Sequence, residues 1–466
     1  MNIPLFSEFS ASDKEAWKQQ AIKDLKGKDF AGTLLWKTAE GLTVQPYYAA
    51  EDTIDERLTS VREAQQKPAG WLNQPEIGYE SEKTTNAEMK AVLSKGADAV
   101  LLVLDKVDAG QIDFSKLFDG IKLSETPVFL QTNGQSVRVI EALLKCLPYQ
   151  WKGGLADDGL AQWMTQGHWP ETYFEGLASV ISATRNSPQF RAVCVSSHVF
   201  HNAGANAVQE LAFTLASAVT YLDKLTDLGL TSAEVMKNLC FSVSVGTNYF
   251  MEIAKLRALR YLWGKIESVW LSEDGTEDTF SLAPCYIHAK TSSFYSAAVT
   301  ADTNMLRATT EAMSAVLGGC NALTVRPYDA ELKKTDDFSA RIARNVSVLL
   351  KEEAHLDKAI DPAAGSYYLD TLTLQMADAA WDLFLEVEAK GGLPAAFEAD
   401  FIQMQIEANF ESALFALQTG QRLMVGVNKF RVEENLPSSP KPKSEEAVPV
   451  SFRLLKNKRI SETFES

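Results

Sequence analysis

The sequence predicts an α/β protein built as a (β/α)8 TIM barrel, with an N-terminal helix-hairpin arm and a C-terminal helical extension. From Trp71 onward, β-rich runs alternate with amphipathic helical patterns, which is typical of a parallel sheet with crossover helices. Eight such runs can be placed, the number that closes this kind of barrel. The 466 residues and 46% hydrophobic content allow most of the chain to form one large domain.

The eight strands are expected near residues 71–77, 99–104, 127–131, 154–156, 192–197, 241–245, 285–290 and 323–326. The helices between them are expected near 85–95, 136–146, 172–184, 204–225, 248–268 and 302–317. The helical pattern between the second and third strands is weak, because only residues 115–121 can form a crossover helix there.

Three regions are expected along the chain. Residues 1–69 predict an arm, because Ser12 and Glu15 form a capping-box pattern that opens a helix, and two short β-like runs follow it. Residues 70–430 are expected to form the barrel and its C-terminal helices. Residues 431–466 begin with a proline- and charge-rich stretch and predict a linker and tail.

Composition limits the partners and the compartment. The formal net charge of −16 argues against nucleic acid and anionic membranes as partners. The five cysteines are far apart and form no C-x-x-C pair, which disfavours a disulfide framework or a zinc site. The first residues lack a basic segment followed by a long apolar run, so a cytoplasmic location is expected.

Residues 191–222 predict a strand, a loop and a helix in succession. Site residues of parallel α/β enzymes lie after the C-terminal ends of strands, so His198 and His201 are the first candidates for chemistry. Two motifs in this stretch carry a family resemblance: Ala203-Gly204-Ala205 and Ala207-Val208-Gln209-Glu210-Leu211-Ala212. The stretch resembles the fifth strand and helix of the methylmalonyl-CoA mutase family, whose catalytic chains read Ser-Gly-Tyr-His-Ile-x-Glu-Ala-Gly-Ala before the same helix.

Further blocks extend the resemblance over most of the chain. They include the helix from Asn248 to Ala258, the Thr291-Ser292 pair with Arg307, and the segments that begin at Asp361 and at Val425. Their number, order and spacing identify the chain as similar to this family.

The positions that carry chemistry in catalytic members differ here, so no catalytic residue is expected. His198 stands at the family tyrosine and Val199 at the family histidine, and an aliphatic side chain cannot hydrogen-bond a thioester carbonyl. Val299 replaces a glutamine, and Thr324 begins the segment that replaces His-Thr-Asn-Ser. No arginine or lysine lies between Gly153 and Thr184, where relatives carry an arginine for the substrate carboxylate. The four positions, His198, Val199, Val299 and Thr324, are interpreted as a vestigial pocket.

No cofactor or metal site is expected in this chain. The family's cobalt ligand lies in Asp-x-His-x-x-Gly, and none of the five histidines has an aspartate two residues before it. A metal pair of His198 and His201 is disfavoured against core histidines, because no carboxylate pattern accompanies them. Asp157 and Asp158 are expected to cap a helix.

Two smaller expectations concern other side chains. Lys255, Arg257, Arg260 and Lys265 are expected to form a solvated or intersubunit face. Cys194 and Cys285 are expected to be small buried hydrophobic residues.

The resemblance implies a non-catalytic small subunit that supports a large subunit in a heterodimer. That partner would bind adenosylcobalamin and interconvert (R)-methylmalonyl-CoA and succinyl-CoA by radical rearrangement. The arm at residues 1–69 either packs on its own domain or reaches over the partner. Two other functions stay open: an active acyl-CoA mutase with an altered pocket, and a stand-alone scaffold that binds a chaperone GTPase.

Overall fold

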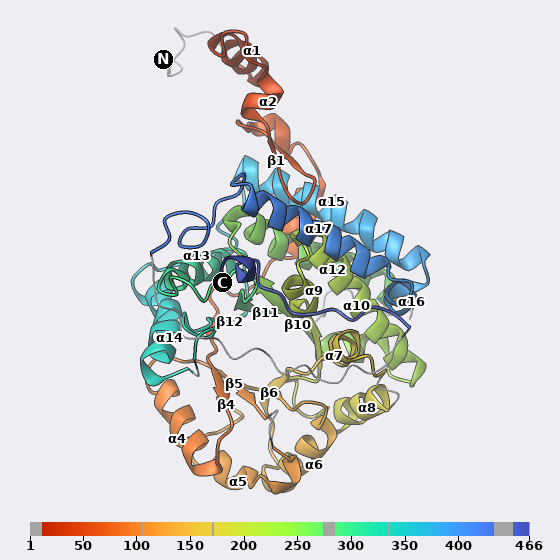
Figure 1. Ribbon diagram of the computed structural model, residues 1–466. Coiled ribbons are helices and arrows are strands. Elements are labelled where there is room, and N and C mark those ends of the chain that lie inside the picture. Colours follow the sequence, from red (N-terminus) through yellow and green to blue (C-terminus); the bar gives the residue numbers. More distant parts are fainter. Residues whose placement is uncertain are drawn as a thin grey trace, which may run out of the picture.

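A computed structural model of the chain describes residues 12–104, 107–169, 172–273, 285–333, 335–432 and 451–465. The predicted (β/α)8 barrel is confirmed, and each predicted strand is present (Figure 1). The barrel strands are β3 (Leu72–Asn73), β4 (Glu76–Gly78), β5 (Val100–Val103), β6 (Val128–Gln131), β7 (Lys152–Leu155), β8 (Gln189–Arg191), β9 (Val193–Ser196), β10 (Leu239–Val245), β11 (Tyr286–Thr291) and β12 (Ala322–Thr324).

The barrel is built from two five-stranded parallel sheets. One has the order β3-β12-β11-β10-β9 and the other the order β4-β5-β6-β7-β8. β3 and β4 are two parts of the first barrel strand, and β8 and β9 are two parts of the fifth. The pairing of β12 with β3 and of β4 with β5 therefore closes the barrel.

Helices connect the strands and cover the barrel. They are α4 (Glu82–Leu93), η2 (Ala109–Gln111), α5 (Phe114–Leu117), α6 (Ser136–Cys146), α7 (Gly159–Gln166), α8 (Tyr173–Ala183), α9 (His198–Ala203), α10 (Ala207–Asp227), α11 (Ser232–Asn238), α12 (Tyr249–Glu273), α13 (Thr303–Leu317) and α14 (Asp337–Glu352). The weak second crossover is filled by η2 and the single-turn α5, as the sequence indicates.

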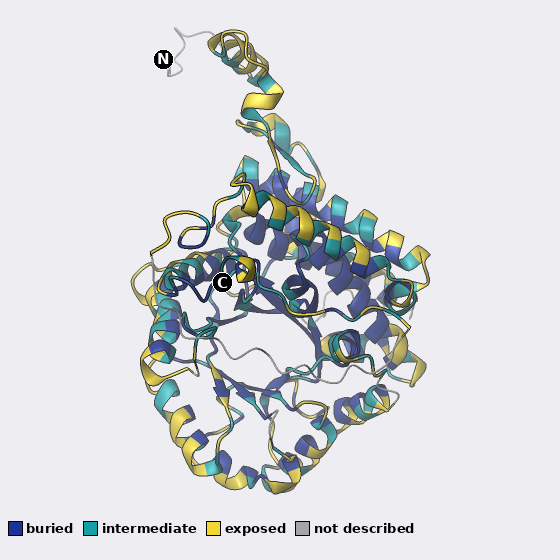
Figure 2. Cartoon of the chain, in the orientation of Figure 1, coloured by how far each residue is buried: buried dark blue, intermediate teal, exposed yellow. Residues whose placement is uncertain are grey.

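A further layer covers one side of the barrel. It consists of α15 (Tyr367–Ala389), α16 (Gly392–Glu398) and α17 (Phe401–Gln418). In Figures 1 and 2 these helices lie outside α10 and α12, which are mostly dark blue because most of their residues are buried. A helix that is covered all round belongs to the core of a large domain.

The arm projects from this helical layer. It contains α1 (Lys14–Asp24), α2 (Phe30–Leu34), the two-stranded antiparallel hairpin of β1 (Trp36–Lys37) and β2 (Thr43–Val44), η1 (Ala50–Thr53) and α3 (Arg57–Glu63). α1 and α2 contain no buried residue and extend away from the barrel (Figure 1). The capping-box prediction is wrong, because Asp13 caps α1 and accepts a hydrogen bond from the Ala16 amide.

The C-terminal segment packs back on the barrel. Leu455, Ile460 and Ser461 are buried, and η3 (Glu462–Phe464) ends the described chain. Of the predicted linker and tail at 431–466, residues 433–450 lie outside the described residues. A search of the described helices finds none with the length and apolar character needed to cross a lipid bilayer.

Candidate functional site in the barrel interior

Strand alternation divides the barrel interior into an apolar and a polar end. At the N-terminal end, a cluster of inward-facing side chains packs together: Leu101, Phe129, Cys194 and Cys240, with Tyr286 against them. Their neighbours in sequence belong to the outer core, as the two-residue period of a strand requires. Toward the C-terminal ends of the strands, the inward-facing residues are hydroxyl, imidazole and charged groups.

A chain of hydrogen bonds crosses this polar end. His198 bonds the Ser244 hydroxyl through Nδ1 at 2.6 Å and the Ser242 hydroxyl through Nε2 at 2.9 Å. Ser242 also bonds Nδ1 of His288 at 2.8 Å, and Nε2 of His288 bonds the Thr324 hydroxyl at 2.8 Å. Five residues from α9, β10, β11 and β12 thus form one network.

Both histidines of this network are neutral. Burial is the main cause that lowers the pKa of His198 well below its usual value and the pKa of His288 to about 3. A neutral imidazole can donate one hydrogen bond and accept one, which matches the two hydroxyl partners of each ring.

An ion pair accompanies the network. Lys290 of β11 contacts the carboxylate of Glu76 on β4. The Lys290 ammonium is the main cause that lowers the pKa of Glu76, so the Glu76 carboxyl is ionised at neutral pH. At the opposite end of the interior, the Arg191 guanidinium lies 4.9 Å from the centroid of the Tyr286 ring and donates to the Lys237 carbonyl.

The structure brings together two of the four residues interpreted as a vestigial pocket. His198 and Thr324 belong to the same hydrogen-bond chain through Ser242 and His288. Val199, on α9, packs in the main hydrophobic core. Val299 packs in a separate apolar cluster on the loop after β11, so neither valine joins the polar chain.

A second buried network lies behind the first and was not expected from the sequence. Lys255 of α12 donates to Glu210 at 2.7 Å and to the Ser244 carbonyl at 2.8 Å, and it pairs with Glu252 at 2.6 Å. His201 bonds Glu210 through Nδ1 at 3.2 Å. Burial raises the pKa of Glu210, but Lys255 and His201 outweigh it and hold the pKa at about 2.

Three of the four basic residues expected on a solvated or intersubunit face are buried instead, so that prediction is wrong for Lys255, Arg257 and Arg260. Arg257 pairs with Asp361 at 2.9 Å and with Asp370 at 2.9 Å, which ties α12 to the helical layer outside it. Arg260 donates to the Asn321 side chain at 2.7 Å.

The expectations for the acids and cysteines hold for Asp158 and Cys194, but not for Asp157 and only partly for Cys285. Asp158 caps α7 by accepting from the Leu160 and Ala161 amides. Asp157 instead accepts from the Thr132 amide. Cys194 is buried, whereas Cys285 is only partly buried.

Three of the five histidines are held by hydrogen bonds inside the barrel. Both ring nitrogens of His198, His201 and His288 have protein partners. His168 and His355 lie exposed on loops. Within the described ranges, no cluster of three or more histidine, cysteine or acidic side chains could hold a metal ion.

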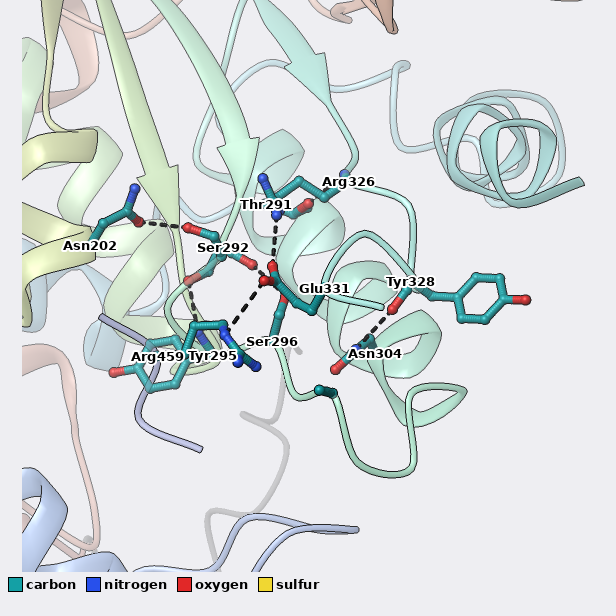
Figure 3. A network of polar contacts seen from close by, with 12 residues as sticks. Asn202, Thr291, Ser292, Tyr295, Ser296, Asn304, Arg326, Tyr328, Glu331 and Arg459 are labelled. Atoms are coloured by element: carbon teal, nitrogen blue, oxygen red, sulfur yellow. Dashed lines mark hydrogen bonds and ion pairs between the residues drawn. The ribbon is translucent and has the colours of Figure 1, made fainter. Parts of the chain in front are cut away.

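A pocket lies beside the polar end of the barrel, where the loops that follow β11 and β12 meet α13. It is lined by Ser292, Ser296, Asn304, Arg307, Glu311 and Arg326, and the space that these side chains border, open solvent included, is about 240 Å³. Figure 3 shows the surrounding contacts, in which Arg326 reaches Glu331 at 2.8 Å and Arg459 of the C-terminal segment lies 3.5 Å from Glu331.

Comparison with known proteins agrees with this fold. The family described as "Methylmalonyl-CoA mutase" matches residues 107–462. The chain is 35% identical to the methylmalonyl-CoA mutase small subunit of Porphyromonas gingivalis, over 91% of this chain and 71% of that protein. It is 31% identical to the small subunit of Streptomyces virginiae, over 94% and 74%, and 29% identical to the large subunit of that organism, over 93% and 65%. The barrel, its motifs and these similarities establish that the chain belongs to the methylmalonyl-CoA mutase family.

Proposed function

We propose that this chain is the non-catalytic small subunit of a two-chain methylmalonyl-CoA mutase in the cytoplasm. In this proposal a large subunit binds adenosylcobalamin, which supplies the radical chemistry there, and interconverts (R)-methylmalonyl-CoA and succinyl-CoA. The present chain stabilises that partner. The two small subunits to which it is similar, and the large subunit known beside one of them, support this assignment.

The charge balance of the barrel interior is the observation that carries the proposal. The acyl group of methylmalonyl-CoA has a free carboxylate, which needs a cation when it is buried. Lys290, the basic group of the polar layer, is already paired with Glu76, and His198 and His288 are neutral. Among the described residues, the polar layer formed by the strands themselves therefore offers this carboxylate no uncompensated positive charge.

The position of the family histidine points the same way. Val199 is buried in the hydrophobic core on α9 and has no group that donates a proton or a hydrogen bond. His198, one residue earlier, has both ring nitrogens occupied by Ser242 and Ser244. For His198 to act on a thioester, one of these two bonds would have to break.

The arm is the candidate interface with the large subunit. Its helices α1 and α2 contain no buried residue, and Trp36 and Ile54 are 49% and 85% exposed. Exposed apolar groups on a projecting segment are typical of an interaction surface. Obligate contacts of this kind bury on the order of 2,000–5,000 Å².

Visible-light titration of the purified chain with adenosylcobalamin, followed by a mutase assay, tests the proposal. The chain alone should give no saturable spectral change and no turnover, and adding the large subunit should give a one-to-one complex with activity. Saturable cofactor binding or turnover by the chain alone would instead support an active mutase with an altered pocket. A stable homodimer indifferent to the large subunit would support a scaffold.

A further inference from the structure

The pocket between the loops after β11 and β12 contains an arginine without an acidic partner. Arg307 of α13 donates to the Asn304 side chain at 2.7 Å and to the Val425 carbonyl, and both acceptors are neutral. Among the described residues, no carboxylate oxygen lies within 4.0 Å of the Arg307 guanidinium, the distance that defines an ion pair. Burial is the main cause that lowers the pKa of Arg307, so its charge is poorly solvated.

A second arginine faces the same pocket with part of its hydrogen-bonding capacity unused. One terminal nitrogen of Arg326 donates to Glu331 at 2.8 Å, but its Nε group is buried and has no acceptor. Glu331 also lies 3.5 Å from Arg459, whose nearest acidic partner is Glu465 at 2.6 Å. A guanidinium presents several N–H donors in a planar fork that suits the oxygens of a carboxylate or phosphate.

The acid at the pocket does not cancel these charges at neutral pH. Glu311 is buried, and burial is the main cause that raises its pKa to about 8, although Arg307 and Arg326 both lower it. Its carboxyl accepts a hydrogen bond from the Ser292 amide at 3.0 Å. Glu252, the other acid that acts on Glu311, is paired with Lys255. The pocket is thus locally positive in a chain whose net charge is −16.

We propose that this pocket binds a compact oxyanion, a phosphate or carboxylate group, between Arg307 and Arg326. The anion would supply the missing counter-charge for Arg307, beside the Arg326 side chain that lines the same pocket. Loops after the seventh and eighth strands are a frequent place for phosphate binding in (β/α)8 barrels. The site lies between α13 and the loops, so it does not depend on the proposed role as a small subunit.

Calorimetric titration of the whole purified chain tests the site with three probes: inorganic phosphate, succinate and, as a neutral control, glycerol. Phosphate or succinate should bind saturably at millimolar concentration, and the tighter of the two identifies the anion class. Arg307→Gln and Arg326→Gln should each weaken binding by about tenfold or more, because each removes a charged donor. Arg138→Gln, at an exposed position on α6 with a 72% exposed side chain, is the matched control and should bind as the parent chain does.

The pH dependence gives a second readout that does not rely on the arginine variants folding. Ionisation of Glu311 above pH 8 would place a negative charge beside the anion, so binding should weaken as the pH rises through about 8. Glu311→Gln stays neutral and should remove this loss. The proposal is overturned if neither anion binds, or if binding is unaffected by both arginine substitutions.

Discussion

Removing Lys255 should strongly destabilise the chain, because it leaves two buried carboxylates without their cation. Lys255 contacts Glu210 at 2.7 Å and Glu252 at 2.6 Å, and all three side chains are at least 93% buried. Breaking a buried ion pair from one side costs about 3–5 kcal/mol. Lys255→Met, which keeps most of the side-chain volume, should lower the free energy of unfolding by this amount.

The same network predicts the pH dependence of that loss. The pKa of Glu210 is about 2 in the folded chain against an ordinary value of 4.5, which corresponds to about 3 kcal/mol of stabilisation. Because the folded pKa is the lower one, this contribution is complete above pH 4.5 and is lost as the pH falls toward 2. In Lys255→Met most of this acid-dependent contribution should be absent.

Urea unfolding followed by the fluorescence of the nine tryptophans measures these effects. The double variant Lys255→Met with Glu210→Gln should recover at least half of the loss, because it removes one of the stranded charges. Lys122→Met is the control, since Lys122 and Glu125 form a pair with 71% and 69% exposed side chains that contributes under about 1 kcal/mol. The reasoning is refuted if Lys255→Met costs no more than Lys122→Met.

Three other predictions follow from the fold and the arm. His288→Gln should reduce the loss of stability below pH 6.5, because the imidazole takes up a proton in the unfolded chain but stays neutral in the folded chain, where its pKa is about 3. The free energy of unfolding measured as a function of pH checks this: the slope due to His288 is at most about 1.4 kcal/mol per pH unit. Gly204→Ala should cost about 1–3 kcal/mol in thermal unfolding, because φ is +110° and the new Cβ would lie 2.8 Å from Phe410. Gly420→Ala, at φ +73° in open space, should cost less. Trp36→Ala should change the free energy of unfolding of the isolated chain by no more than about 0.5 kcal/mol, because Trp36 is exposed. It should weaken binding of the large subunit by about 2 kcal/mol, as measured with one subunit immobilised on a surface. Binding equal to that of the parent chain would show that Trp36 is not part of the interface.

The strands could be predicted because each has a short apolar run with turn residues on both sides. The outer face of every barrel strand is buried under helices, so runs such as Val100–Val103 and Val128–Gln131 are nearly continuous in apolar residues. The splitting of the first and fifth strands was not predictable, since it depends on how the two sheets diverge in space.

The charged residues of α12 could not be placed from the sequence. Lys255, Arg257 and Arg260 resemble a solvated stripe, because Lys and Arg are rarely buried without a partner. Their partners lie far along the chain: Glu210 precedes Lys255 by 45 residues, and Asp361 follows Arg257 by 104. The one available signal was Glu210 itself, a charged residue near the start of an otherwise apolar helix.

The division of the barrel into two sheets has a consequence for how the chain folds. The sheet from β4 to β8 covers residues 76–191, and each of its strands pairs with the next one along the sequence. It can assemble as soon as this segment leaves the ribosome. In the other sheet β9 to β12 also pair in chain order, but β3 reaches its neighbour only when β12 arrives, with Leu72 opposite Ala322. Ring closure is therefore a late event of synthesis, and the early half presents two unpaired strand edges until then.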